Sequence, residues 1–159
     1  MTIESLLPPA PALVPMAQVR CEVGDLVSLG AAKYGERRYV ALTGGTVVGP
    51  EFSGTILEGG VDWQINRADG VLDISAHYVV RTADGALVEV QSDGMRHGPA
   101  EVLARLARGE PARREEYFFR TAMRFQTGHP QWLHLNRVLA LAVGQREARL
   151  VVLDVYRIT

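Results

Sequence analysis

Apolar and polar positions alternate along most of this 159-residue chain, in short segments rich in Val, Ile, Thr and Tyr. Turn sequences that contain glycine separate these segments at short intervals, among them Gly44-Gly45, Gly59-Gly60, Asp69-Gly70 and Asp93-Gly94. A period of two predicts β-strands, and regular turns between short strands are typical of an antiparallel meander or barrel. Residues 71–82 and 86–92, joined through Ala83-Asp84-Gly85, predict a hairpin.

Residues 98–110 depart from this alternation. Val102, Leu103 and Leu106 recur there at helical spacing, with Pro99 near the start and Gly109 near the end. The pattern predicts a helix of about three turns, which we expect to cover one end of the barrel. Three further strands are predicted after it, in residues 116–127, 132–144 and 149–158. The middle one is mostly apolar on both faces, so we expect it to be buried on both sides.

These elements predict an all-β fold with one short helix, a closed antiparallel barrel of about eight to ten strands. Residues 1–14 are expected to form an extended proline-rich arm laid over the surface, and residues 15–159 a single domain. Closure removes exposed sheet edges, and a barrel of about eight strands can hold one small ligand inside.

Composition narrows the class of protein. Hydrophobic residues make up 47% of the chain, the formal net charge is −1, and the basic residues form no stripe, so nucleic acid is not an expected partner. No apolar run approaches 18 residues, and the N-terminus lacks the pattern of a secretory signal. The single cysteine, Cys21, cannot form an internal disulfide and is predicted to be a buried apolar residue. We expect a cytoplasmic protein with no membrane partner; a homodimer is compatible with the aliphatic strands.

Strand alternation groups the polar candidates on common faces, although it does not tell which face is inside. One face of residues 61–66 carries Asp62, Gln64 and Asn66, with Trp63 on the other face, and one face of residues 72–81 carries Asp73, Ser75 and His77. In residues 117–126, Phe118, Arg120, Arg124 and Gln126 share one face, and Phe119, Thr121 and Phe125 share the other. In residues 132–142, Trp132, His134 and Asn136 share a face. Each candidate has a structural alternative. Asp62 can cap a turn, His134 and Asn136 can be satisfied core residues, and Arg96 stands in a predicted loop where solvent exposure is the default.

Several chemistries lack their motifs. The chain has no glycine-rich phosphate loop with lysine and no nucleophile elbow, and its four histidines have no metal-binding spacing. Neither a cofactor nor a metal is therefore predicted. Arg120 lies between aromatic residues, where we expect it to pair with an acid or with an anionic or phenolate ligand.

Four long segments, residues 42–72, 81–101, 117–128 and 135–147, resemble the domain-of-unknown-function 3237 family, and the resemblance extends from about Leu13 to Ile158. It implies a closed antiparallel barrel related in shape to lipocalin-like barrels. Most members have no assigned activity. Some fungal members act in polyketide pathways as cofactor-free cyclases, which close an oxygen ring by adding a hydroxyl across an alkene. The resemblance thus implies proton-transfer chemistry on a phenolic or enone substrate.

The family motifs fall on particular residues of this chain. Gly-Gly-x-Asp-Trp matches residues 59–63, Phe-Arg-Thr matches residues 119–121, and Leu-Asn matches residues 135–136. The chain departs from typical members at Gln126, where they carry Glu, at His134, where they carry Trp, and at His77, where they carry Arg. The lost glutamate removes a carboxylate that could act as a base, whereas imidazoles suit acid/base work near neutral pH.

The resulting hypothesis is a cofactor-independent isomerase or lyase of the cyclase type. It would act by general acid/base proton transfer on an aromatic, phenolic or polyketide-like small molecule inside the barrel. The expected catalytic residues are Asp62, His134, Arg120 and His77; the expected substrate-binding residues are Trp63, Arg96, Phe118, Phe125, Gln126 and Asn136. The alternative is a non-catalytic barrel that binds such a molecule unchanged. A third reading, a purely structural or assembly role, would direct these polar residues to the surface or to one another.

Overall fold

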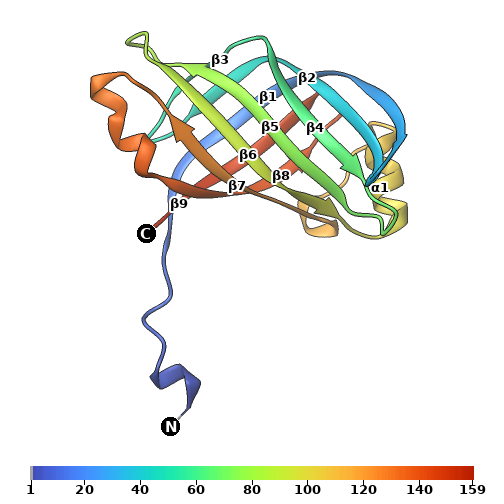
Figure 1. Cartoon of the computed structure of the whole chain (residues 1–159), viewed down its shortest axis with the longest axis horizontal. Coiled ribbons are helices and arrows are strands. Elements are labelled where there is room, and N and C mark those ends of the chain that lie inside the picture. Colours follow the sequence, from blue (N-terminus) through green and yellow to red (C-terminus); the bar gives the residue numbers. More distant parts are fainter. Residues whose placement is uncertain (1) are drawn as a thin grey trace.

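The computed structural model describes residues 2–159 and shows one antiparallel sheet closed into a ring (Figure 1). Its nine strands are β1 (Leu13–Ala32), β2 (Gly35–Val48), β3 (Gly54–Ile56), β4 (Gly60–Asn66), β5 (Leu72–Arg81), β6 (Leu87–His97), β7 (Phe118–Gln126), β8 (Leu139–Arg146) and β9 (Leu150–Ile158). The sheet order is β1-β9-β8-β7-β6-β5-β3-β2-β4, and the additional pairings β1–β2 and β4–β5 complete the ring. The predicted barrel and the predicted β5–β6 hairpin are both confirmed.

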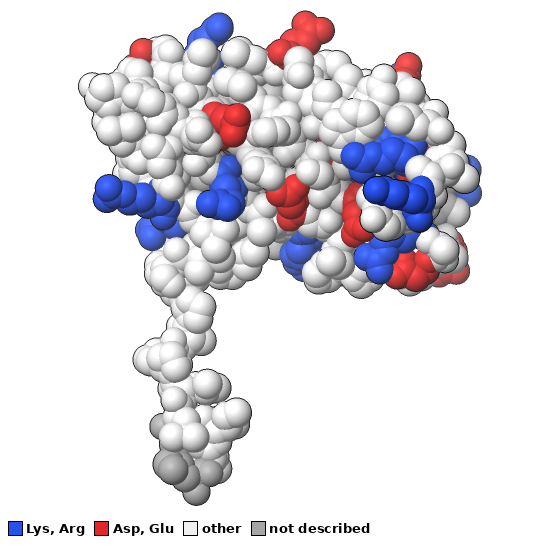
Figure 2. All heavy atoms as spheres, viewed as in Figure 1, with Lys and Arg blue, Asp and Glu red and all other residues white. Residues whose placement is uncertain are grey.

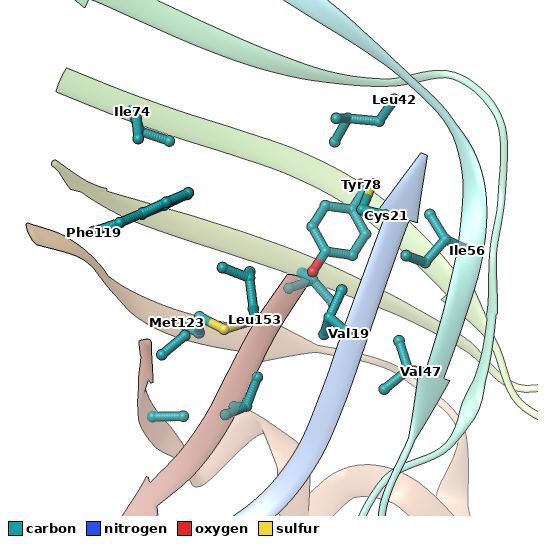
Figure 3. Close-up of a cluster of buried hydrophobic side chains, with 14 of the residues drawn as sticks. Val19, Cys21, Leu42, Val47, Ile56, Ile74, Tyr78, Phe119, Met123 and Leu153 are labelled. Carbon is teal, nitrogen blue, oxygen red and sulfur yellow. The ribbon is translucent and has the colours of Figure 1, made fainter. Parts of the chain in front are cut away.

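Alternation along the strands sorts side chains between the interior and the solvent. In β7, Phe119, Thr121, Met123 and Phe125 are buried, whereas the residues between them are exposed. Every strand except β4 contributes buried residues to one hydrophobic core, and Figure 3 shows part of it. Close strand approach requires glycine at Gly45, where φ is 132° and an added Cβ would lie 2.0 Å from the Arg20 carbonyl oxygen.

The predicted helix is present as α1 (Ala100–Ala107). It begins after Pro99 and ends before Gly109, whose φ of 74° is the left-handed conformation that glycine adopts readily. Val102 and Leu106 are buried, so the apolar stripe of the helix packs against the barrel. Figure 1 shows α1 at one end of the barrel, as expected.

The prediction that residues 132–144 form one strand is wrong in its first half. Residues Pro130–Arg137 form the 3-10 helix η3, and β8 begins only at Leu139. Pro130 favours a helical first turn, and the His129 ring accepts a hydrogen bond from the Gln131 backbone N–H at 3.4 Å. The side chain of Asn136 bonds both the N–H and the carbonyl of Thr127, at 2.8 and 2.9 Å, and so holds η3 against the end of β7. Figure 1 shows η3, in orange, at the opposite end of the barrel from α1.

Residues 2–12 precede the barrel and include the short 3-10 helix η1 (Ile3–Ser5); another, η2 (Arg114–Glu116), precedes β7. Figure 1 shows this N-terminal arm running away from the barrel, not laid over its surface as predicted. Met1, the first residue of the predicted arm, lies outside the described residues. Acidic and basic side chains are interspersed on the face in Figure 2. No helix within residues 2–159 is long and apolar enough to cross a membrane.

Candidate functional site

A cavity of about 410 Å³ lies inside the barrel, which is within the range of about 300–1,000 Å³ for small-molecule sites. Eight strands contribute to its wall, β1, β2 and β4 to β9, and α1 adds Leu103, Leu106 and Ala107. Most of the lining is aliphatic or aromatic. A few polar side chains interrupt it, and they come from strands that are far apart in the sequence.

Strand β4 supplies the acidic group of the cavity. Asp62, Gln64 and Asn66 all line it, so the shared face predicted from alternation is the inner one. The Nε–H of Arg38 donates to the Gln64 Oε1 at 2.9 Å, and the Gln64 amide N–H donates to Asp62 Oδ2 at 2.7 Å. This chain of hydrogen bonds orients the carboxyl group and uses one of its two oxygens. The other, Oδ1, is buried and has no hydrogen-bond partner among residues 2–159.

The environment changes the acidity of Asp62. Burial raises the pKa of its carboxyl to about 6, against the smaller opposing effects of the Gln64 hydrogen bond and of the positive charges on Arg96 and Arg146. The residue as a whole is only partly covered because it faces the cavity, but Oδ1 itself is shielded. Near neutral pH this carboxyl can therefore both release and accept a proton.

Arg96 also lines the cavity. The sequence predicts a loop here, with solvent exposure as the default, but β6 continues to His97 and directs this side chain inward. Its Nε is buried and has no hydrogen-bond partner within the described residues, and its guanidinium lies 5.9 Å from the centre of the Phe119 ring. Burial, together with the charges of Arg146 and Arg38, lowers its pKa to about 10.

Two further arginines of the cavity, Arg38 and Arg146, were missed as candidates. Burial lowers the pKa of both side chains. A signal for each was present: Arg38 has the strand parity of the buried Val40 and Leu42, and Arg146 has that of Ala140 and Ala142. Charge normally argues for the solvent face, which is why parity alone did not select them.

Tyr78 and Cys21 also line the cavity. The Tyr78 ring lies among apolar side chains (Figure 3), and its hydroxyl is buried without a hydrogen-bond partner in the described part of the chain. Burial raises the pKa of this hydroxyl, and it raises the pKa of the Cys21 thiol to about 12. Cys21 is therefore a neutral buried thiol, and its prediction as a buried residue is confirmed. Ser92 donates to the Thr121 hydroxyl at 2.8 Å, so these two groups satisfy each other.

Of the candidate residues, Asp62 and Arg96 line this cavity and the other eight do not. Four candidates point outward. His77 lies 3.3 Å from Glu89, and Trp63 packs against Tyr39, with 5.1 Å between ring centres. Arg120 covers Phe118 on the outer surface at 5.1 Å from the ring centre. The cause is the strand parity, because the inner face of β7 carries Phe119 and Thr121 instead.

The remaining candidates lie away from the cavity lining as well. Gln126 is exposed at the end of β7. His134 is exposed on η3, at the opposite end of the barrel from α1, with its ring stacked 6.0 Å from the centre of the Trp132 ring. Asn136 stabilises η3 through its two hydrogen bonds with the Thr127 backbone. Phe125 is buried in the core against Phe52, with 5.8 Å between ring centres, outside the cavity wall.

In the part of the chain that the structure describes, no three His, Cys, Asp or Glu side chains are grouped so that they could hold a metal ion.

The family model described as "Protein of unknown function (DUF3237)" matches residues 11–158. The chain belongs to the DUF3237 family. A UPF0311 protein of Rhodopseudomonas palustris is 39% identical over 140 residues, which are 88% of this chain and 92% of that protein. The family resemblance inferred from the motifs is thereby confirmed.

Solved structures of similar proteins share this fold. The crystal structure of a conserved protein of unknown function from R. palustris matches with a TM-score of 0.89 at 36% identity, covering 96% of this chain and 100% of that one. A β-barrel-like protein from Acinetobacter baumannii matches with a TM-score of 0.83 at 35% identity, covering 96% and 99%.

One fungal relative has a named activity. A hydroalkoxylation enzyme of Penicillium herquei is 45% identical over 49 residues, which are 31% of this chain and 32% of that protein. The crystal structure of an enzyme from P. herquei shares the fold, with a TM-score of 0.71 at 23% identity over 96% of this chain and 98% of that one.

Proposed function

We propose that this protein is a cofactor-independent enzyme of the isomerase or lyase type. It binds an aromatic, phenolic or polyketide-like small molecule in the barrel cavity and transfers a proton through Asp62. The observation that carries the proposal is the Asp62 carboxyl, whose Oδ1 is buried and unpartnered in the wall of a cavity of ligand size. The hydroalkoxylation activity of the fungal relative supports the choice of reaction.

Ring closure by hydroalkoxylation is balanced without any further reactant. The substrate hydroxyl loses its proton, its oxygen bonds one alkene carbon, and the other alkene carbon gains a proton. Asp62 as carboxylate accepts the hydroxyl proton, and as carboxylic acid it returns a proton to carbon. A pKa of about 6 keeps both forms accessible near neutral pH, which suits this alternation between base and acid.

The surroundings of Asp62 favour this use of its carboxyl. Gln64 donates to Oδ2 and so fixes the orientation of the carboxyl in the cavity wall. The nearby guanidinium groups of Arg96 and Arg146 would stabilise the negative oxygen that forms when the hydroxyl is deprotonated. Apolar walls limit water, which strengthens these electrostatic interactions. His134, His77 and Arg120 have no part in this proposal, because they do not line the cavity.

The test uses 2-alkenylphenols, such as 2-prenylphenol, incubated with the protein in deuterated water. Turnover gives a cyclic ether isomer, separable by chromatography, with one deuterium on the carbon that was protonated. Asp62→Asn should lower the rate at least about 100-fold, as is typical when general acid/base help is lost. The matched control is Glu58→Gln, which neutralises an exposed carboxyl outside the cavity. An unchanged rate in Asp62→Asn removes Asp62 from the reaction, whereas binding without any turnover supports the non-catalytic alternative.

A further inference from the structure

Positive charge exceeds negative charge on the cavity wall. Arg38, Arg96 and Arg146 line it from β2, β6 and β8, and Asp62 is the one acidic residue among the described residues of its wall. Three guanidinium groups against one carboxylate leave an excess of two positive charges, even when Asp62 is ionised. Such an excess in a largely apolar cavity is costly unless a counter-charge enters it.

The protein's own acids do not supply this counter-charge. Within residues 2–159, no carboxylate oxygen lies within 4.0 Å of a side-chain nitrogen of Arg96 or Arg146, and Arg38 reaches only Glu36, at 4.0 Å. By contrast, surface arginines such as Arg157 and Arg105 are paired at 2.9 and 2.7 Å. What distinguishes the cavity arginines from unpaired surface arginines is that burial lowers their pKa, because their charge is partly withdrawn from water.

Arg96 is the clearest case. Its Nε is buried and has no hydrogen-bond partner among the residues that the structure describes. The neighbouring Phe119 ring, 5.9 Å away, provides a flat apolar surface beside the guanidinium. Both Phe119 and Arg96 line the cavity, so an aromatic ring and an acidic group on it could be recognised side by side.

We propose that Arg38, Arg96 and Arg146 form an anion-binding site, and that the ligand of this cavity is an amphipathic aromatic anion. Its apolar ring system packs against side chains such as Phe119, Ile74 and Leu153, and its carboxylate, phenolate or enolate oxygens accept from the guanidinium groups. The inference specifies the substrate class of the function proposed above and rests on the same cavity. The lowered pKa of Arg96, caused by burial and by the other two arginines, is consistent with an incomplete charge arrangement that an anion completes.

The experiment measures binding and needs no turnover. Isothermal titration compares 2-naphthoate with 2-naphthamide, which has nearly the same shape and no charge. We expect 2-naphthoate to bind at least 10-fold more tightly. A second pair, 2,4-dinitro-1-naphtholate and its uncharged methyl ether, repeats the comparison for an ionised hydroxyl. The two pairs together distinguish a preference for carboxylate from a preference for an ionised hydroxyl.

Two variants assign the preference to the arginines. Arg96→Gln should weaken 2-naphthoate binding at least 10-fold and leave 2-naphthamide binding unchanged; Arg146→Gln, measured alongside it, keeps the test valid if Arg96→Gln does not fold. The control Arg124→Gln removes an exposed arginine of β7 and should change neither affinity. Equal binding of charged and neutral probes, no binding of either anion, or equal losses for both probes in the variants would overturn the anion site.

The two proposals can fail separately. Asp62→Asn should still bind 2-naphthoate, and more tightly than the wild type does, because a like charge has been removed. If that variant keeps both binding and turnover, the catalytic assignment of Asp62 fails and the anion site stands. If turnover depends on Asp62 but no charge preference exists, only the anion site fails.

Discussion

Replacing Asp62 by Asn should stabilise the folded protein at neutral pH. Burial raises the pKa of this carboxyl from 3.8 to about 6, so the folded state binds the proton more tightly than the unfolded state does. Protonated Asp62 therefore makes its full contribution to the free energy of unfolding below about pH 4, and this contribution is lost as the pH rises through about 6. A shift of about 2 pKa units, at about 1.4 kcal/mol each, amounts to about 3 kcal/mol. Asparagine keeps the shape and an acceptor for Gln64 without the buried charge.

The assay is urea denaturation at pH 4, 5, 6 and 7.5. Asp62→Asn should be about 2–3 kcal/mol more stable than the wild type at pH 7.5, and the difference should shrink toward zero at pH 4. Glu58→Gln, the exposed control, should show no such trend. The reasoning is refuted if Asp62→Asn is less stable at pH 7.5, because the attraction of Arg96 and Arg146 would then outweigh the cost of burial.

Three other substitutions test separate parts of the structure, each by urea denaturation together with 2-naphthoate titration. Tyr78→Phe should raise the free energy of unfolding by about 1 kcal/mol, because the buried hydroxyl lacks a partner; a loss of stability would show that the hydroxyl is satisfied. Gly144→Ala should lower the free energy of unfolding by about 1–3 kcal/mol and weaken 2-naphthoate binding, because the new Cβ would lie 2.5–2.7 Å from Phe119 ring carbons and push that ring toward the cavity. Unchanged 2-naphthoate binding would contradict this. Asn136→Ala should cost about 1–3 kcal/mol through the lost hydrogen bonds to Thr127, with binding unchanged because η3 lies at the other end of the barrel. Weakened 2-naphthoate binding by Asn136→Ala would show that η3 affects the ligand site.

Fold and site differ in how far local sequence can predict them. Turn spacing and alternation were enough for a closed antiparallel barrel, and helical spacing with Pro99 and Gly109 was enough for α1. These signals are local, because each depends on residues within a few positions of one another. Local patterns do not predict the 3-10 helix η3, because its apolar residues also fit a strand. The contact that stabilises η3, between Asn136 and Thr127, spans nine positions.

For the site, alternation determined which residues share a face but not which face is inside. Asp62, Gln64 and Asn66 were grouped correctly, whereas in β7 both faces carry a phenylalanine beside polar residues, so Phe118 and Phe119 were equivalent candidates. Only closure of the sheet breaks this equivalence, since the curvature of the ring assigns one face of every strand to the interior at once.

The sequence by itself determined the all-β class, the α1 helix, the burial of Cys21 and the inclusion of Asp62 in a family motif. Tertiary structure alone decided that Arg38, Arg96 and Arg146 meet around Asp62, because their strands are joined only by the closed ring of hydrogen bonds. It also decided the acidity of Asp62, since the pKa of a carboxyl depends on the water it loses and the charges it faces, and a linear chain specifies neither.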